Sequence, residues 1–285
     1  MKYAWIADHQ SQFSAAKLCQ VLAVSRCGYQ QWRTRPKSER AITNQALTAY
    51  IKQLHVEYRH TYGRRRMRHA LLAEGLLASE QRIARLMKLH QLHAHIRRRW
   101  RPRSSAGQAQ GLANTLAHTT VTQANQAWVT DMTYLKTQQG WLYLATVMDA
   151  YTRQIIGWAM GQRMTTALIE QAFLMAMKQR QPTTPVVVHS DQGSQYMSQA
   201  YQSLLKRLNC IPSVSKRGHC YDNAMMESFF HSLKVESLYR YPVLPVEQTK
   251  SLIFNYIEGF YNPKRTHSAL NYLSPNDFDK LHLPT

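Results

Sequence analysis

The sequence predicts a two-part protein, with a basic, all-helical first part and a mixed α/β second part. Residues 1–105 contain 21 Lys and Arg against 5 Asp and Glu, a net charge of +16, whereas residues 106–285 carry a net charge of +4. Apolar residues recur at helical spacing in the first part, and β-branched or aromatic runs separated by short turns appear only after residue 120. A chain of 285 residues is long enough to bury a core in each part.

The first part is predicted to contain helices joined by short turns. Two short helices are expected over 12–35, where Ser25 is placed to cap the second one. Further helices are expected over 42–96, because apolar residues recur there at helical spacing, with a break at Gly63 and a new start at Ser79. The arrangement resembles a helix-turn-helix region.

The second part begins after a stretch of low periodicity. Residues 97–120 open with a basic block and continue in Ser, Ala, Gly and Gln, which is typical of a linker. Three antiparallel strands are then predicted in "AWVTDMTYLKT", "GWLYLATVMDAYT" and "RQIIGWAMG". The helix "TTALIEQAFLMAMKQR", the buried strand in "TPVVVHSDQG", a helix at 198–209, a strand at 211–216 and a helix at 222–236 follow. This order predicts a mixed sheet flanked by helices.

The charge of the first part predicts a polyanionic partner. Neutralisation of phosphates by Lys and Arg favours DNA or RNA over a membrane surface, and no run approaches the roughly 18 apolar residues of a membrane span. The N-terminus lacks the apolar core of a signal peptide. The four cysteines form no CxxC pair, which is ordinary in a reducing compartment, so a cytoplasmic location is expected.

Two aspartates in the second part require an explanation. Asp131 lies in the middle of a predicted strand, where carboxylates are disfavoured, and Asp191 directly follows the strand "VVVHS". If these two strands are neighbours, the carboxylates converge, and a hard divalent cation would neutralise them. Taken singly, each carboxylate also fits a purely structural role, and Asp149 in "VMDAYT" is expected to be a turn residue.

The helix at 222–236 offers several polar groups for a third role. Asp222 is expected to cap the helix, and Glu227 borders the apolar side marked by Met226, Phe230 and Leu233. Glu236 lies at the far end, where a negative charge suits the helix dipole poorly and no other group is expected to converge. A zinc site on Cys220 with His219 or His231 is disfavoured, because no second pair with ligand spacing accompanies it.

The motifs taken together resemble a known family. Asp131, Asp191 and Glu227 are separated by 59 and 35 residues, and "WVTDMTY", "HSDQGSQY", "DNAMMESFF" and "YNPKRTHSALNYLSP" surround or follow them. "VSRCGYQQW" and "YGRRRMRHALLAEGLLASEQRIARLM" extend the likeness to the first part. The chain is similar to the second-reading-frame transposases of the insertion sequence 3 family, which have a catalytic core of the retroviral integrase type.

The resemblance implies an RNase H-like fold and metal-dependent phosphoryl transfer on DNA. Asp131, Asp191 and Glu227 would be the catalytic triad and would hold two Mg²⁺ or Mn²⁺ ions for in-line displacement at phosphorus. The expected activity is cleavage of DNA at the element ends followed by transfer of the 3′-hydroxyl to another strand. The alternatives are a DNA-binding regulatory product, or an RNase H-like nuclease without strand transfer.

The resemblance also implies partners and supporting residues. The expected partners are the terminal inverted repeats and target DNA in the nucleoid, further copies of the chain, and the upstream-frame protein, either separate or fused. Lys234, seven residues after Glu227, would contact DNA, whereas pairing with Glu227 or Asp222 is the alternative. The other predicted DNA contacts are Arg64, Arg65, Arg66, Arg97, Arg98 and Arg99, and the predicted orienting residues are His189, Gln192 and Asn223.

The expected domain division follows these features. It comprises a helix-turn-helix-like segment at 1–40, a basic helical DNA-binding domain at 41–103, a linker at 104–120 and an integrase-type catalytic domain at 121–285, with the core at about 124–240 and a helical tail at 241–285.

Overall fold

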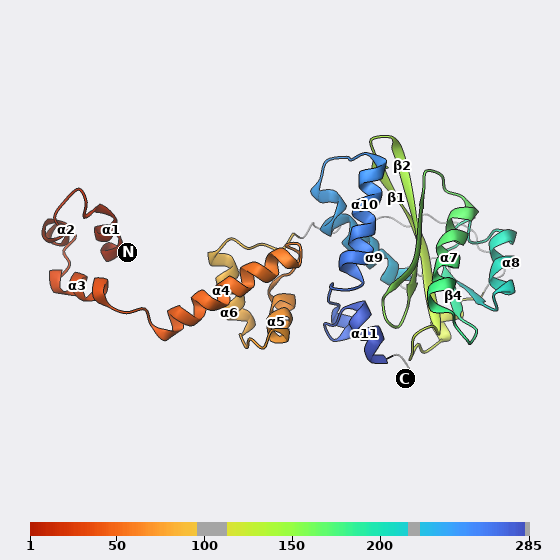
Figure 1. Ribbon diagram of the computed structural model, residues 1–285, viewed down its shortest axis with the longest axis horizontal. Coiled ribbons are helices and arrows are strands. Elements are labelled where there is room, and N and C mark those ends of the chain that lie inside the picture. Colours follow the sequence, from red (N-terminus) through yellow and green to blue (C-terminus); the bar gives the residue numbers. More distant parts are fainter. Residues whose placement is uncertain (96–112, 216–222, 283–285) are drawn as a thin grey trace. The chain divides into compact units, whose positions relative to one another are not determined.

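The computed structural model describes residues 1–95, 113–215 and 223–282 (Figure 1). The chain forms two compact units, Met1–Lys52 and Gln53–Thr285. Within the described ranges, no helix combines the length and the apolar character needed to cross a membrane.

The first unit begins with three short helices, α1 (Lys2–His9), α2 (Ala15–Val21) and α3 (Arg26–Thr34). The predicted pair of helices is confirmed as α2 and α3, and Ser25 caps α3 by accepting a hydrogen bond from the amide of Gly28. The sequence analysis did not predict α1. Its Ile6 is fully buried and packs with residues of α2 and α3, so this small core needs all three helices.

The basic region continues as helices into the second unit. Helix α4 (Glu39–Glu57) spans the boundary between the units, and α5 (Arg64–Ala73) and α6 (Glu80–Leu89) follow. Gly63 is the N-cap residue of α5, and Ser79 caps α6 by accepting from the amide of Arg82, as the sequence predicts. The all-helical character of the basic region is confirmed over residues 1–95.

The second unit is built on a five-stranded sheet with the order β3-β2-β1-β4-β5. The strands are β1 (Ala127–Thr137), β2 (Gly140–Asp149), β3 (Ile155–Gly161), β4 (Val187–Ser190) and β5 (Ile211–Val214). The first three are antiparallel neighbours, and β4 and β5 run parallel to β1. The predicted mixed sheet is confirmed, as is the adjacency of the first and fourth strands.

Helices cover both faces of this sheet (Figure 1). Because side chains alternate along a strand, Trp128 of β1 packs on one face with α7 (Thr166–Arg180) and α8 (Gln199–Arg207), whereas Val129 packs on the other with α9 (Ala224–Glu236) and α10 (Val246–Tyr256). The helix that carries Glu227 therefore lies on the face to which the odd-numbered residues of β1 point.

The short elements attach to this core. A 3₁₀ turn, η1 (Leu116–His118), lies beside β5, where the amide of Leu116 donates to the Ser213 hydroxyl at 3.0 Å. Asn114, within the stretch expected to be a linker, is buried. After α9 and η3 (Leu238–Arg240) come α10, the π-helical turn η4 (Ile257–Tyr261), η5 (Ser268–Leu270) and α11 (Pro275–His282).

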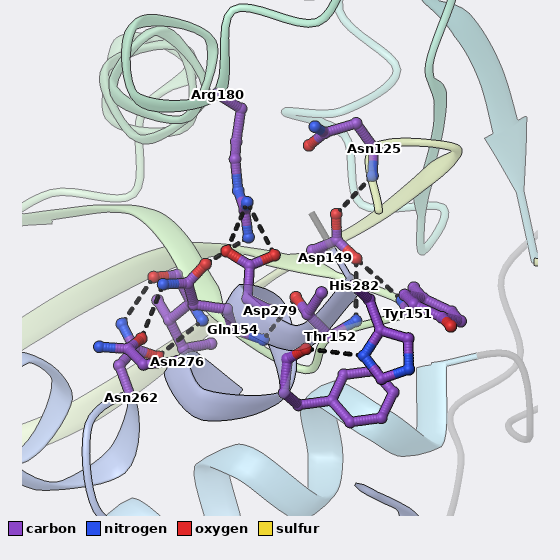
Figure 2. Close-up of polar contacts among 12 residues, drawn as sticks. Asn125, Asp149, Tyr151, Thr152, Gln154, Arg180, Asn262, Asn276, Asp279 and His282 are labelled. Carbon is purple, nitrogen blue, oxygen red and sulfur yellow. Dashed lines mark hydrogen bonds and ion pairs between the residues drawn. The ribbon is translucent and has the colours of Figure 1, made fainter. Parts of the chain in front are cut away.

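Polar contacts connect the C-terminal tail, residues 241–282, to β3 and α7 (Figure 2). The Asn262 side chain donates to the carbonyl of Ile155 and accepts from its amide, both at 2.9 Å. Arg180, at the end of α7, pairs with the Asp279 carboxylate of α11 at 2.9 and 3.0 Å. Asn262 belongs to the late "YNPKRTHSALNYLSP" motif, and its role here is to satisfy buried backbone groups of β3.

Candidate active site

The two aspartates occupy equivalent positions on neighbouring parallel strands. Strands β1 and β4 pair only over Ala127 to Val129, and the last pair joins Val129 to His189. Asp131 and Asp191 each lie two residues beyond that pair, so the strand geometry directs both to the same end of the sheet. The converging carboxylates predicted from the sequence thus have a simple origin in the strand register.

The backbone around Asp191 holds its carboxylate in a tight turn. The amide of Gly193 donates to Asp191 Oδ1 at 2.9 Å. A Cβ atom on residue 193 would lie 2.9 Å from the same oxygen, closer than such atoms normally approach, so a larger residue would displace the carboxylate. Asp191 itself is exposed at the end of β4.

Residues flanking Asp191 tie this turn to β5. His189 is fully buried, and its ring nitrogens lie 2.9 Å from the hydroxyls of Ser213 and Ser215. The Gln192 amide donates to the carbonyl of Ser215 at 2.8 Å. Two of the three predicted orienting residues, His189 and Gln192, thus link the segment that carries Asp191 to β5 and the residue after it.

Glu227 lies in the first turn of α9 with its side chain exposed. Its helix neighbour Met226 is completely buried, and Phe230 is nearly so, which places Glu227 at the border of the packed face. Asn223 is at the N-cap position of this helix and makes no capping hydrogen bond. Asp222, the predicted cap, lies outside the described residues.

The charges of the other two carboxylates affect the pKa of Asp131. Burial raises its pKa, and the charges of Asp191 and Glu227 raise it further, to about 7. Hydrogen bonds from the amide of Met132, whose nitrogen lies 2.7 Å from Oδ1, and from the Asn223 side chain oppose this shift. Three acidic groups from distant parts of the chain thus share one electrostatic environment.

The donor set suits a hard divalent cation. The three carboxylates supply oxygen ligands, and the buried Oδ1 of Asn223, beside Asp131, has no hydrogen-bond partner among the described residues. Over residues 1–95, 113–215 and 223–282, no three His, Cys, Asp or Glu side chains are grouped tightly enough to enclose a metal ion.

Lys234 of α9 contacts β1 beside this site. Its Nζ donates to the Thr133 hydroxyl at 2.8 Å, two residues beyond Asp131 on the same face of the strand. Burial lowers the pKa of Lys234, while the Asp131 carboxylate acts in the opposite direction. The partner seen in the structure is therefore a β1 hydroxyl.

A cleft of about 470 Å³ opens between the start of α5 and the side of α9 next to Glu227. Arg64 and Arg65 line it with side chains 58% and 73% exposed, each near Glu80 at 3.6 and 4.0 Å. Ser228 and His231 of α9 line the opposite wall. The predicted DNA contacts Arg97, Arg98 and Arg99 lie outside the described residues.

Arg66 differs from its two neighbours because it points inward. It lies 3.8 Å from Glu236, whose carboxylate also accepts three hydrogen bonds, two from Arg265 and one from the Tyr256 hydroxyl, at 2.7 to 2.8 Å. The expectation that nothing converges on Glu236 is therefore wrong. Burial alone would raise the pKa of Glu236, but Arg265, Tyr256 and Arg66 hold it below its usual value.

Other polar residues have structural roles. The Asp149 carboxylate is fully buried and accepts from the amides of Asn125, Tyr151 and Thr152 at 2.7 to 3.0 Å, which confirms the predicted turn (Figure 2). Cys210 is buried, which raises its thiol pKa to about 11. Cys220 and His219, of the disfavoured zinc site, lie outside the described residues.

Most of the chain matches models of known protein families. Residues 121–220 match an integrase core domain, residues 227–283 match a second integrase core domain description, and residues 43–100 match an HTH-like domain.

Individual proteins resemble the chain over almost its whole length. The insertion element IS600 uncharacterized 31 kDa protein of Shigella sonnei is 40% identical, with 93% of this chain and 98% of that protein covered. Transposase InsF for insertion sequence IS3A of Escherichia coli is 38% identical, with 99% and 100% covered. Among solved structures, the simian T-cell lymphotropic virus intasome has a similar chain at 18% identity and a TM-score of 0.48, over 76% of this chain and 72% of that one.

Proposed function

The chain belongs to the IS3 family of insertion-element transposases, a group of polynucleotidyl transferases with an integrase core, and from this we propose which of its residues carry the reaction. Asp131, Asp191 and Glu227 are the catalytic carboxylates. The enzyme cleaves DNA at the ends of its element and joins the released 3′-hydroxyl to another strand.

One observation carries this assignment. Asp131 and Asp191 lie at matching positions beyond the last β1–β4 pair, and the charges of Asp191 and Glu227 help to raise the pKa of Asp131 to about 7. Structural carboxylates in this protein, such as Asp149, accept hydrogen bonds from backbone amides. The carboxylates of the candidate site instead repel one another. A site that holds like charges together is suited to a cation and a phosphate.

The integrase core family is divalent-metal dependent, and we assign two Mg²⁺ or Mn²⁺ ions to Asp131, Asp191 and Glu227. When bound, the ions polarise the phosphodiester and neutralise charge on the attacking and leaving oxygens. A hydrogen bond from Asn223 favours the carboxylate form of Asp131, and the amide of Gly193 holds Asp191 in its turn. Lys234 is positioned to meet a phosphate next to Asp131.

The DNA partner is held by the basic part of the chain. The segments at 1–40 and 41–103 would bind the terminal inverted repeats, joined by the linker at 104–120 to the catalytic domain at 121–285. Arg64 and Arg65, exposed in the cleft beside α9, would contact phosphates. Arg97, Arg98 and Arg99, outside the described residues, are further proposed phosphate contacts. A homo-oligomer on DNA and association with the upstream-frame protein, separate or fused, complete the proposed assembly in the nucleoid.

The decisive experiment incubates the full chain with Mg²⁺ and labelled duplexes that carry the terminal repeat flanking its gene. We expect strand-joined products. Asp131→Asn, Asp191→Asn and Glu227→Gln should each abolish joining while leaving retardation of the duplex intact, and Glu247→Gln, which removes a carboxylate 81% exposed on α10, should join normally.

The outcomes separate the alternatives. Cleavage without joining would support a nuclease, and retardation without cleavage would support a DNA-binding regulatory product or a requirement for the upstream-frame partner. Normal joining by Glu227→Gln would refute the assignment of Glu227.

A further inference from the structure

Two large aromatic side chains are exposed near the turn of the β1–β2 hairpin. Tyr134 is 58% exposed and Trp141 is 50% exposed, and their ring centroids lie 5.2 Å apart in an edge-to-face arrangement of 87°. In the strand register Tyr134 faces Tyr143, and Trp141 faces Lys136. Single exposed aromatics are ordinary, but two in mutual contact form an apolar surface that burial does not explain.

Positive charge borders this aromatic pair. Lys136, two residues from Tyr134 on the same strand face, is exposed. Lys234 reaches the pair from α9, with its ammonium group 5.9 Å from the Tyr134 ring centroid and 2.8 Å from the Thr133 hydroxyl. Exposed rings flanked by lysines match the combination that proteins use to bind unpaired nucleic acid, in which bases stack on rings and cations meet phosphates.

The distance along β1 from Asp131 to the aromatic pair limits how many nucleotides can lie between them. Tyr134 is three residues beyond Asp131, and Lys136, opposite Trp141, is five beyond, which corresponds to roughly 10 to 16 Å along the strand. Because side chains alternate along a strand, Tyr134 points to the opposite face of β1 from Asp131, so a bound DNA strand would cross the edge of β1 between them. A strand with the duplex spacing of 3.4 Å per nucleotide covers this distance in about three to five nucleotides, and a more extended unpaired strand covers it in fewer. Beyond Val129, β1 has no pairing with β4, so the strand edge that leads from Asp131 to Tyr134 is not covered by β4.

We propose that Tyr134 and Trp141 form a stacking platform for a base of an unpaired DNA strand, within about five nucleotides of the phosphate that is cut. This inference rests on the proposed catalytic role of Asp131 for the identity of that phosphate. The platform recognises the flat face of a base, so it tolerates any sequence, and Lys136 and Lys234 hold the adjoining phosphates.

The first test measures binding without any divalent cation, so its result is independent of catalysis. The full chain is titrated with two labelled 20-nucleotide strands of equal charge, oligodeoxythymidine and a strand made of abasic spacers. We expect the wild type to bind the thymidine strand about tenfold more tightly, because base stacking on aromatic rings has roughly that effect. Tyr134→Ala combined with Trp141→Ala should lose most of this preference, whereas Tyr134→Phe combined with Trp141→Phe should retain it.

Phe254→Ala is the matched control. Phe254 of α10 is also 50% exposed and forms an edge-to-face pair with Trp158, at the β3 edge of the sheet. It should keep the full preference for bases, and thermal unfolding should verify that every variant is folded. Equal binding of both strands by the wild type would overturn the proposal, as would persistence of the preference in the double alanine variant or its loss in Phe254→Ala.

The second test locates the base. A single abasic site is moved from the first to the eighth nucleotide of an unpaired strand at the cleaved end of the element, and affinity is measured at each position. A loss confined to positions among the first five nucleotides is expected, and only in the protein that retains Tyr134 and Trp141. A loss elsewhere, or at the same positions in the double alanine variant, would refute the placement, while joining activity in Mg²⁺ would still stand on its own test.

Discussion

At the scale of single residues, the carboxylates of this protein divide by the partners they have. Asp149 accepts three backbone amides, and Glu236 is surrounded by arginines, so each is stabilised in place. Asp131 instead lies near Asp191 and Glu227, which oppose its ionisation. The folded protein keeps this unfavourable arrangement, which is typical of a site whose function requires charge to be gathered before its partner arrives.

Replacement of Asp131 by Asn should stabilise the metal-free protein while it abolishes strand joining. The folded pKa of about 7 lies above the reference value of 3.8, so ionisation of Asp131 destabilises the fold as the pH rises between these values. We expect a gain of about 2 kcal/mol in the free energy of unfolding at pH 8, roughly half of what the pKa difference implies because solvent reaches the side chain. The gain should shrink toward pH 4. Denaturant unfolding at several pH values, without divalent cations, measures it, and an unchanged stability at pH 8 would contradict the electrostatic description.

Replacement of Glu236 by Gln should have the opposite effect. It leaves the charges of Arg265 and Arg66 buried without a counter-ion, which costs about 3 to 5 kcal/mol. Because the folded pKa of Glu236 is lowered, the wild type has this stabilisation above the reference value of 4.5 and loses it as the pH falls through the folded pKa.

The matched control for Glu236 is Glu247→Gln, whose carboxylate is 81% exposed and pairs with Lys250 within one helix turn. It should change the free energy of unfolding by less than about 1 kcal/mol. Urea unfolding at neutral and acidic pH tests both variants, and equal effects of the two substitutions would show that the buried pair contributes nothing.

At the scale of secondary-structure elements, the contact between α7 and β3 depends on one glycine. A Cβ atom on Gly157 would lie 2.2 Å from the carbonyl oxygen of Ala172 and 2.8 Å from Ala176, so α7 can approach β3 only because residue 157 lacks a side chain. Gly157→Ala should therefore destabilise the protein by about 1 to 3 kcal/mol through overpacking.

Gly259 provides the comparison for Gly157. It lies in the helical turn after α10, and a Cβ atom there would meet nothing within 4 Å. Gly259→Ala should be neutral or slightly stabilising, since alanine loses less backbone entropy in a helix. Calorimetric melting of the two variants measures the difference, and similar melting temperatures would mean that β3 and α7 can separate without cost.

Local pattern was sufficient to predict most elements but not the contacts among them. The strands from β1 to β5 and the caps Ser25 and Ser79 follow from residues close in sequence, and they are confirmed. The pairing of Glu236 with Arg265 joins residues 29 apart, and that of Asn262 with Ile155 joins residues 107 apart. Such partners depend on how α9 and the tail pack, which periodicity does not encode.

The same limit applied to the candidate site. Spacing and family likeness were enough to single out Asp131, Asp191 and Glu227, because each stands in a distinctive local motif. Helix α9 starts at Ala224 with Asn223 at the N-cap position, one residue later than the start that short-range sequence led us to expect. The inward orientation of Arg66 was equally hidden, since Arg64, Arg65 and Arg66 are identical in sequence.

At the scale of the whole molecule, the net charge of +20 should make DNA binding strongly dependent on salt. Arg64→Ala and Arg65→Ala should each reduce the slope of log affinity against log salt by about 1, because each removes one phosphate contact. Arg66→Ala should leave the slope nearly unchanged and lower the free energy of unfolding instead, because its guanidinium faces Glu236.

The three neighbouring arginines thus serve as controls for one another. Retardation of a random duplex at several salt concentrations measures the slope, and urea unfolding measures stability. An equal loss of slope in all three variants would show that Arg66 leaves Glu236 to meet DNA.

The contact of Arg66 with Glu236 also bears on how such elements can evolve. A helical region transplanted from a relative without a cation at this position would leave the acceptor on α9 short of one partner, and the chimera would inherit a weakened catalytic helix. We expect natural shuffling between insertion elements to exchange both positions together or neither. The seam at which DNA-recognition modules could be swapped therefore lies upstream of α5, in or before α4, and designed hybrids with new target ends should be joined there.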